Sequence, residues 1–241
     1  MTKAPLLRYN GVKLFWRKFP PFMQNMQDAH TTHNVQRKPH PYQEFIQTVE
    51  KPARYLGGEY LSVQKDWETT PVKVAIAFPD IYEIGMSHMG MKILYSILNK
   101  QEDILAERVY CPWIDMEAEL RARSLPLYTM ENTRSLAEFD VVGFSLQYEM
   151  TYTNVLNMLD LCQIPIRSED RDLSYPLVIA GGPCAVNPEP MSPFIDAFVI
   201  GDGEEIFPQI SRTYVELREA GASKTDILIA LAKLGGVYCP V

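Results

Sequence analysis

Short apolar runs alternate with amphipathic segments from about residue 71 onward. The apolar runs are 72–78 (VKVAIAF), 106–111 (AERVYC), 139–146 (FDVVGFSL), 175–182 (YPLVIAGG) and 196–201 (DAFVIG). The segments that follow them have a helical pattern and span 88–100, 114–124, 150–162, 204–221 and 224–234. Near-continuous apolar strands that alternate with helices are typical of a parallel sheet covered on both faces. The pattern therefore predicts an α/β domain, residues 71–241, with a mostly parallel five-stranded sheet and helices on both faces.

The chain before this domain divides into two parts. Residues 1–40 contain four prolines, show no helical or strand period and carry a formal charge of +6, whereas residues 41–241 carry −13. A basic arm can bind nucleic acid, but this composition favours a poorly ordered leader. Residues 41–70 are expected to form a lead-in: a short helix over 41–51 that Pro52 ends, a turn at Gly57–Gly58 and a short strand.

Composition indicates the cellular compartment of the protein and the state of its cysteines. The 241 residues carry a net charge of −7, and no apolar run approaches the roughly 20 residues of a membrane-spanning helix. No apolar stretch near the start resembles a secretory signal, so we expect a cytoplasmic protein. The four cysteines are scattered without metal-ligand spacing, which favours reduced thiols.

Unusual residues follow the ends of all five predicted strands. The loops are PDIYEIGMSHMG (79–90), CPW (111–113), SLQYEMTY (145–152), GGPCAVNPEP (181–190) and GDGEE (201–205). A parallel sheet brings such loops to one edge, and ligands of open α/β sheets bind beyond the carboxyl ends of the strands. The sequence therefore predicts a ligand site at this edge.

Each loop also has a purely structural explanation. The pair Gly181–Gly182 can simply turn the chain. Asp202 and Glu205 have the spacing of a capping box at a helix start. His88 is expected to cap or pack rather than to bind a ligand.

The methionines near the first helix have a structural explanation as well. Met86, Met89 and Met91 fit core filling, with Met89, Ile93 and Ile97 on one helix face. These explanations account for the loops singly, but not for their common position at one edge.

The loops resemble those of cobalamin-binding domains, a Rossmann-like fold related to flavodoxin. The turn DIYEIGMSHMG resembles their Asp-x-His-x-x-Gly turn, with Tyr82 in place of the cobalt-ligating histidine. The stretches GFSL and LVIAGG resemble the strand ends that flank the buried nucleotide tail of the corrinoid in that family. The resemblance implies seven cofactor-binding residues: Asp80, Tyr82, Gly85, Ser145, Gly181, Gly182 and Pro183.

The resemblance also implies a role for most of these residues. Gly85 would permit the tight turn, and Asp80 would fix it through hydrogen bonds. Ser145 would contact the nucleotide tail, and the Gly181–Gly182 pair would let the backbone approach it. Tyr82 is a poor cobalt ligand because an unperturbed phenol has a pKa of roughly 10. A corrinoid would therefore bind without a lower protein ligand.

A longer stretch of sequence, together with two others, resembles a more specific family. GGPCAVNPEPMSPFIDAFVIGDGEE, with VEKPARYLGGEY and FSLQYEMTYTNVLNMLDL, resembles the amino-terminal part of a family of much longer bacterial radical S-adenosylmethionine (SAM) proteins. The resemblance covers residues 45–241. It implies a domain that presents cobalamin or a substrate to a radical SAM core, its partner within the full-length protein.

The catalytic motif of that core is missing from this chain. Radical SAM enzymes hold a [4Fe–4S] cluster on Cys-x3-Cys-x2-Cys, whereas these cysteines are 51, 22 and 55 positions apart. The cluster and SAM are thus expected only in a missing catalytic part, and this chain alone is expected to be inactive.

Two alternatives stay open. The first is a docking or substrate-selecting domain that kept the fold and lost the corrinoid, which Tyr82 and the bulky CAVNPEP loop favour. The second is a flavin or nucleotide site, which is disfavoured because no phosphate-binding glycine loop follows the first strand.

Overall fold

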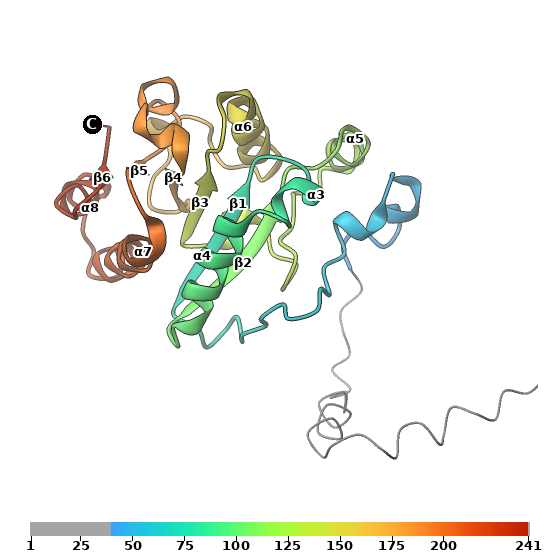
Figure 1. Cartoon of the computed structure of the whole chain (residues 1–241), viewed down its shortest axis with the longest axis horizontal. Helices are drawn as coiled ribbons and strands as arrows, with labels where there is room; N and C mark the ends of the chain where they lie inside the picture. Colours follow the sequence, from blue (N-terminus) through green and yellow to red (C-terminus); the bar gives the residue numbers. More distant parts are fainter. Residues whose placement is uncertain (1–39, 241) are drawn as a thin grey trace, which may run out of the picture. The chain divides into compact units, whose positions relative to one another are not determined.

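Six strands form one sheet at the centre of residues 40–240, the part of the chain that the computed structural model describes (Figure 1). They are β1 (Val72–Phe78), β2 (Ile104–Tyr110), β3 (Val141–Ser145), β4 (Leu177–Gly181), β5 (Ala197–Val199) and β6 (Val237–Tyr238). Their order is β2-β1-β3-β4-β5-β6, and the first five strands run parallel. The predicted α/β, Rossmann-like sheet is confirmed. The sixth strand, β6, pairs antiparallel with β5 and was not predicted, because it is only two residues long.

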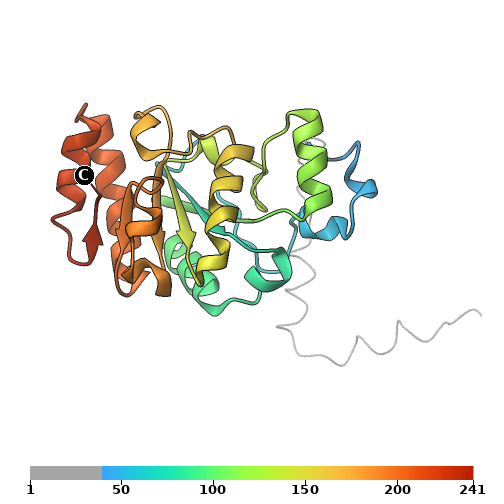
Figure 2. The same cartoon turned by 90° about the horizontal axis from the view of Figure 1, so that it is seen from above.

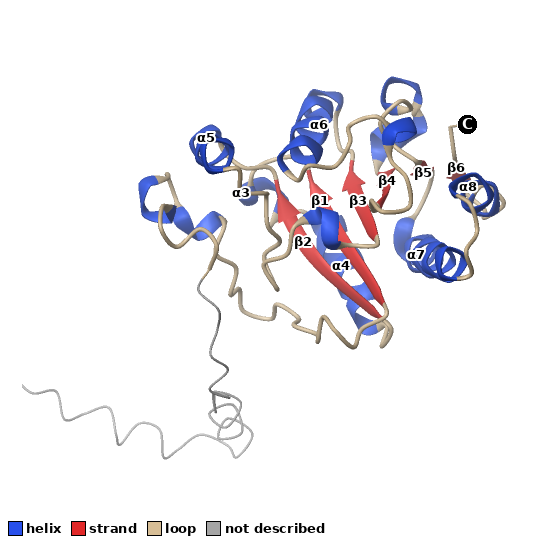
Figure 3. Cartoon of the chain, turned by 180° about the vertical axis from the view of Figure 1, so that it is seen from behind, coloured by secondary structure: helices blue, strands red, loops and turns tan. Residues whose placement is uncertain are grey.

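Helices cover both faces of the sheet (Figures 2 and 3). Helices α4 (Met89–Lys100), α7 (Gly203–Glu219) and α8 (Lys224–Leu231) share one hydrophobic cluster with one face of the sheet. Helices α5 (Ile114–Arg123) and α6 (Tyr152–Leu161) share a second cluster with the other face. Successive residues of β1 alternate between the clusters, since Ile76 belongs to the first and Ala77 to the second. Each strand thus presents every second side chain to α4 and α7.

The lead-in reaches the core without regular structure. Residues 41–51 form turns and a short 3-10 helix (Ile46–Thr48) rather than the predicted helix, and no strand follows Gly57–Gly58. Tyr42 and Phe45 are nevertheless buried against the face covered by α5 and α6. Tyr42 Oη donates to the Pro126 carbonyl at 3.1 Å and accepts from the Tyr128 amide at 2.8 Å. These tertiary contacts override the local helical pattern. The predicted leader, apart from His40, lies outside the described residues.

Helix α4 is rotated relative to the predicted face. Met91, Tyr95 and Leu98 are its buried residues, whereas Met89 and Ile93 are exposed, so the predicted buried face is wrong. Both sets of residues have helical spacing, and the neighbouring strands decide which set faces the sheet. None of the helices in residues 40–240 combines the length and hydrophobicity needed to cross a bilayer.

Candidate functional site

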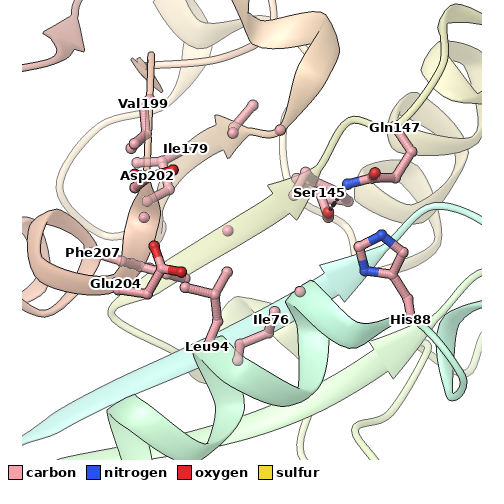
Figure 4. Close-up of a pocket in the computed structure, with 18 residues that line it drawn as sticks. Ile76, His88, Leu94, Ser145, Gln147, Ile179, Val199, Asp202, Glu204 and Phe207 are labelled. Atoms are coloured by element: carbon pink, nitrogen blue, oxygen red, sulfur yellow. Dashed lines mark hydrogen bonds between the residues drawn. The ribbon is translucent and has the colours of Figure 1, made fainter.

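A cavity of about 220 Å³ lies between the sheet and helices α4 and α7, at the carboxyl ends of the strands (Figure 4). It is lined by Ile76, His88, Gly90, Leu94, Gly143, Phe144, Ser145, Gln147, Ile179, Ala180, Gly181, Gly182, Val199, Gly201, Asp202, Gly203, Glu204 and Phe207. The loops after β1, β3, β4 and β5 all contribute, and the loop after β2 does not. The strand order reverses between β1 and β3, and both strands line the cavity. The cavity therefore lies at the switch point where this architecture binds ligands.

Two glycines hollow out the sheet at this point. Gly143 on β3 and Gly181 on β4 stand at alternating positions with Val141 and Ile179, which face α4 and α7. A Cβ at Gly143 would lie 2.5 Å from Phe207 Cζ, so the missing side chain admits the Phe207 ring. A Cβ at Gly181 would meet only Val199, at 3.6 Å. The space beside Gly181 is thus left open.

One side of the cavity carries three uncharged or weakly basic polar groups. Gln147 Nε2 donates to Ser145 Oγ at 2.7 Å, which leaves the Ser145 proton free to donate. His88 caps α4, where its Nδ1 accepts the Met91 amide at 3.3 Å. A neutral His88 ring therefore carries its proton on Nε2 and is a donor. The expectation that His88 caps a helix is confirmed, and its ring also lines the cavity.

The other side carries two carboxylates, Asp202 and Glu204, at the start of α7 (Figure 4). The predicted capping box does not form, because the Asp202 side chain makes no capping hydrogen bond. Within residues 40–240 neither carboxylate has a hydrogen-bond or ion-pair partner, and no lysine or arginine lines the cavity. The site therefore combines an apolar floor with donors on one side and anionic acceptors on the other.

The structure brings three of the seven predicted residues to the cavity: Ser145, Gly181 and Gly182. Gly182 adopts a φ of 106°, and a Cβ there would lie 2.7 Å from the Leu146 carbonyl oxygen. Glycine is thus required at 182 by the backbone itself. Pro183 begins a 3-10 helix (Pro183–Val186) and does not line the cavity.

The other three predicted residues lie in the turn after β1 and do not line the cavity. The Asp80 carboxylate accepts from the Ile81 amide at 2.7 Å and from the Tyr148 hydroxyl, which joins the loops after β1 and β3. Gly85 packs against Tyr110, whose ring would lie 2.5 Å from an added Cβ. Gly85 belongs to the short helix α3 (Tyr82–Gly85).

Tyr82 belongs to a network at the edge of the sheet. Its hydroxyl donates to Glu59 of the lead-in, and Glu59 pairs with Arg108 on β2 at 2.5 Å. Burial, together with this hydrogen bond, raises the pKa of Tyr82 to about 12. The Arg108 guanidinium also binds the buried Glu131 carboxylate at 2.7 Å. Tyr82 thus connects α3 to the Glu59–Arg108 pair, which holds the lead-in against β2.

The cysteines lie apart from one another. Cys111, Cys162 and Cys239 are buried and Cys184 is half-buried. Burial raises the pKa of both the Cys111 and Cys162 thiols to about 12. Residues 40–240 contain no group of three or more His, Cys, Asp or Glu side chains arranged to hold a metal ion.

Several lining residues were not among those predicted. Ile76, Leu94 and Phe207 form the apolar floor and walls, and their sequence positions read simply as core. The available signal was the pair Gly143 and Gly181, since both interrupt an apolar strand on the same face near its carboxyl end.

The fold and the cavity define an α/β domain with flavodoxin-like strand order and a cavity at its switch point. The family model described as "Radical SAM proteins, N-terminal" matches residues 90–240, more than half of the chain. The chain therefore belongs to this family.

A relative from Methanocaldococcus jannaschii, the uncharacterized protein MJ0966, is 26% identical over 132 residues. The aligned part covers 54% of this chain and 24% of that protein. The chain thus matches about a quarter of the length of this relative.

Proposed function

We propose that this chain is the part of a radical SAM protein that holds a small molecule at the carboxyl edge of its sheet. The ligand is either a corrinoid, bound through its nucleotide tail, or a substrate. In both cases this domain would present it to a radical SAM core elsewhere in the protein. The core would contain the [4Fe–4S] cluster and bind SAM. The observation that carries the proposal is the cavity at the switch point, which Gly181 keeps open.

The cavity suits part of a corrinoid rather than the whole. Its volume of about 220 Å³ is below the roughly 300–1,000 Å³ of pockets that enclose a drug-sized ligand. It would therefore hold one ring system, such as the base of the tail, between Phe207, Leu94 and the glycine-rich backbone. Tyr82 is hydrogen-bonded to Glu59 and lies outside the cavity. This supports a corrinoid that binds without a protein ligand on the lower face of its cobalt. When bound, a corrinoid supplies radical or group-transfer chemistry.

Closing the cavity tests this proposal. Gly181→Val adds a branched side chain beside Val199 at a position without a left-handed backbone, so the fold should tolerate it. We expect Gly181→Val to weaken cobalamin binding by about tenfold or more, since overpacking typically costs about 1–3 kcal/mol. The measurement is cobalamin titration followed by absorbance, with melting temperatures recorded for each variant.

Gly235→Val is the matched control, because no atom lies within 4 Å of a Cβ at Gly235 and the residue does not line the cavity. It should bind cobalamin like the parent. A parent chain that does not bind cobalamin, or a Gly181→Val variant that binds it equally well, contradicts the corrinoid proposal.

A docking function is the second candidate, favoured by exposed apolar side chains around the same edge. Ile114, Met150 and Val186 follow β2, β3 and β4, and their exposed fractions are 73%, 86% and 71%. We infer that this apolar rim, which also includes Met89, packs against the radical SAM core of the full-length protein. Hydrogen exchange should then show the loops around Ile114, Met150 and Val186 protected in the full-length protein relative to this chain. Equal exchange in both would exclude the docking role.

A further inference from the structure

We propose that the group held in the cavity is an amino-substituted heteroaromatic base of the aminopurine class. The inference rests on the proposed ligand-binding function and names the chemistry that the cavity selects. In the corrinoid case, this base is the lower base of the nucleotide tail. Three properties of the cavity favour such a base: the shape of its walls, the hydrogen-bonding groups on its two polar sides and its charge.

The walls of the cavity favour a ligand that is flat and apolar. Phe207, Leu94, Ile76 and Ile179 supply ring and aliphatic surface, while glycine backbone replaces side chains along much of the remaining wall. Glycine backbone lets a planar ring approach closely, and aromatic rings stack favourably with bases. The cavity of about 220 Å³ therefore fits a bicyclic ring system rather than a flexible chain.

The polar sides select opposite hydrogen-bonding edges on that ring. His88 Nε2 and the Ser145 hydroxyl are donors and would face ring nitrogens. Asp202 and Glu204 can only accept when ionised, so they require N–H groups on the ligand. An aminopurine carries both kinds of group, with acceptor nitrogens in the ring and an exocyclic amino group. Figure 4 shows Glu204 and Asp202 on the α7 side, across the cavity from His88 and Ser145.

The negative charge of the cavity disfavours phosphate groups and bases that lack an N–H donor. A phosphate beside Asp202 or Glu204 would meet like charge without a lysine or arginine to offset it, so phosphate groups stay outside. A dimethylbenzimidazole base linked to its sugar has no N–H donor, and would leave the half-buried Glu204 carboxylate without a partner. Sites built around a hydrogen bond discriminate strongly against ligands that lack it. Glu204, which is half-buried, contributes more to this selection than the exposed Asp202.

The experiment compares three bases that are methylated at the nitrogen to which a sugar is attached: 9-methyladenine, 9-methylpurine and 1,5,6-trimethylbenzimidazole, called adenine, purine and dimethylbenzimidazole below. Methylation removes the ring N–H that the free bases would carry. Each base is titrated calorimetrically into the parent chain. Adenine and purine differ only by the amino group, which makes the pair a direct probe of the carboxylates. We expect adenine to bind about tenfold or more tightly than purine, since a hydrogen bond to a charged group is worth roughly one to two powers of ten. Dimethylbenzimidazole should bind more weakly than adenine as well.

Variants assign the preference to Glu204. Glu204→Met keeps the length of the side chain and removes its charge and acceptors, so it should lower adenine affinity to the level of purine and leave purine affinity unchanged. Glu205→Met is the matched control: it lies next to Glu204 on α7, is exposed and does not line the cavity, so it should keep the adenine preference. Equal affinity of the parent for adenine and purine, or an adenine preference that survives Glu204→Met, overturns the inference.

The outcomes separate this inference from the proposed function. If cobalamin binds and is weakened by Gly181→Val, but adenine shows no preference, the ligand site stands and the base assignment fails. If adenine is preferred through Glu204 and cobalamin does not bind, the base assignment stands and the corrinoid assignment fails. If the parent binds none of the bases and no cobalamin, both are wrong.

Discussion

The shape of the site depends on contacts at single residues, and Gly143 is the clearest example. It lies in the middle of β3, paired with Ile76 on one side and Ile179 on the other. Its missing side chain is replaced by the ring of Phe207, which is buried and lines the cavity. The residue therefore couples the packing of α7 to the floor of the site.

We expect Gly143→Ala to destabilise the domain by about 1–3 kcal/mol, because its Cβ would overlap Phe207. Adding Phe207→Leu should recover part of this loss, since the two substitutions share one contact and are not additive. The measurement is urea unfolding of the single and double variants. Gly235→Ala, with open space around its Cβ, is the control and should change stability little. Equal destabilisation by both alanines would contradict the packing argument.

At the scale of elements, β2 is an edge strand secured by buried charge. Arg108 on this strand lies between Glu59 of the lead-in and Glu131, at 2.5 Å and 2.7 Å. Glu107, one residue earlier, is also buried and accepts from Thr129 and from Asn132. One cation thus holds two segments against the strand.

This network predicts a pH dependence. Burial raises the pKa of Glu131 from 4.5 to about 7 despite the opposing Arg108 charge, and the nearby Glu107 acts in the same direction as burial. Between pH 4.5 and about 7, Glu131 is therefore protonated in the folded state and ionised in the unfolded state. The free energy of unfolding should therefore fall as the pH rises from about 4.5 to about 7.

The parent should lose on the order of 1–3 kcal/mol relative to Glu131→Gln across this interval. Urea unfolding at several pH values measures the difference. The exposed Glu169→Gln variant controls for the loss of one negative charge. Parallel profiles for the parent and Glu131→Gln would show that Glu131 does not titrate there.

The sheet was predictable because its strands are buried on both faces. Runs such as 72–78 are apolar at almost every position and are too short for a typical buried helix, which favours a buried strand. The predicted boundaries differ from the observed ones: β2 begins at Ile104 rather than at residue 106. The lead-in could not be predicted locally, because its positions are set by distant residues: Tyr42 is hydrogen-bonded to residues 84 and 86 positions away, and the Phe45 ring lies under Arg123.

The site was predictable only in part. Strand ends indicated the edge at which the cavity lies and three of the residues that line it, because parallel strands all end there. Phe207 and Leu94 could not be found, since helix residues that line a cavity have the same pattern as core residues. The structural role of Tyr82 depends on Glu59, which is 23 positions earlier and gives no local signal.

At the scale of the whole molecule, the cysteines of this chain bear on the proposed link to a radical SAM core. This chain has four cysteines, none within the compact spacing of a cluster motif. Three of them are buried in the described domain, and the thiolate is the form that binds iron. These four cysteines are therefore unsuited to hold the cluster of the proposed radical SAM core.

We expect the chain, reconstituted anaerobically with iron and sulfide, to bind no [4Fe–4S] cluster and to leave SAM intact. Iron analysis and assay of 5′-deoxyadenosine measure the two properties. A stoichiometric cluster with SAM cleavage would overturn the assignment of catalysis to another part of the protein.

The hydrogen bond between Asp80 and Tyr148 has a consequence for binding kinetics. It restrains the loops after β1 and β3 against each other, and backbone hydrogen bonds of Leu146 with Gly181 and Cys184 join the loops after β3 and β4, so most of the cavity is formed before any ligand arrives. A preformed cavity needs little rearrangement during association. We expect related ligands to enter at similar rates and to differ in residence time, which sets their order of affinity.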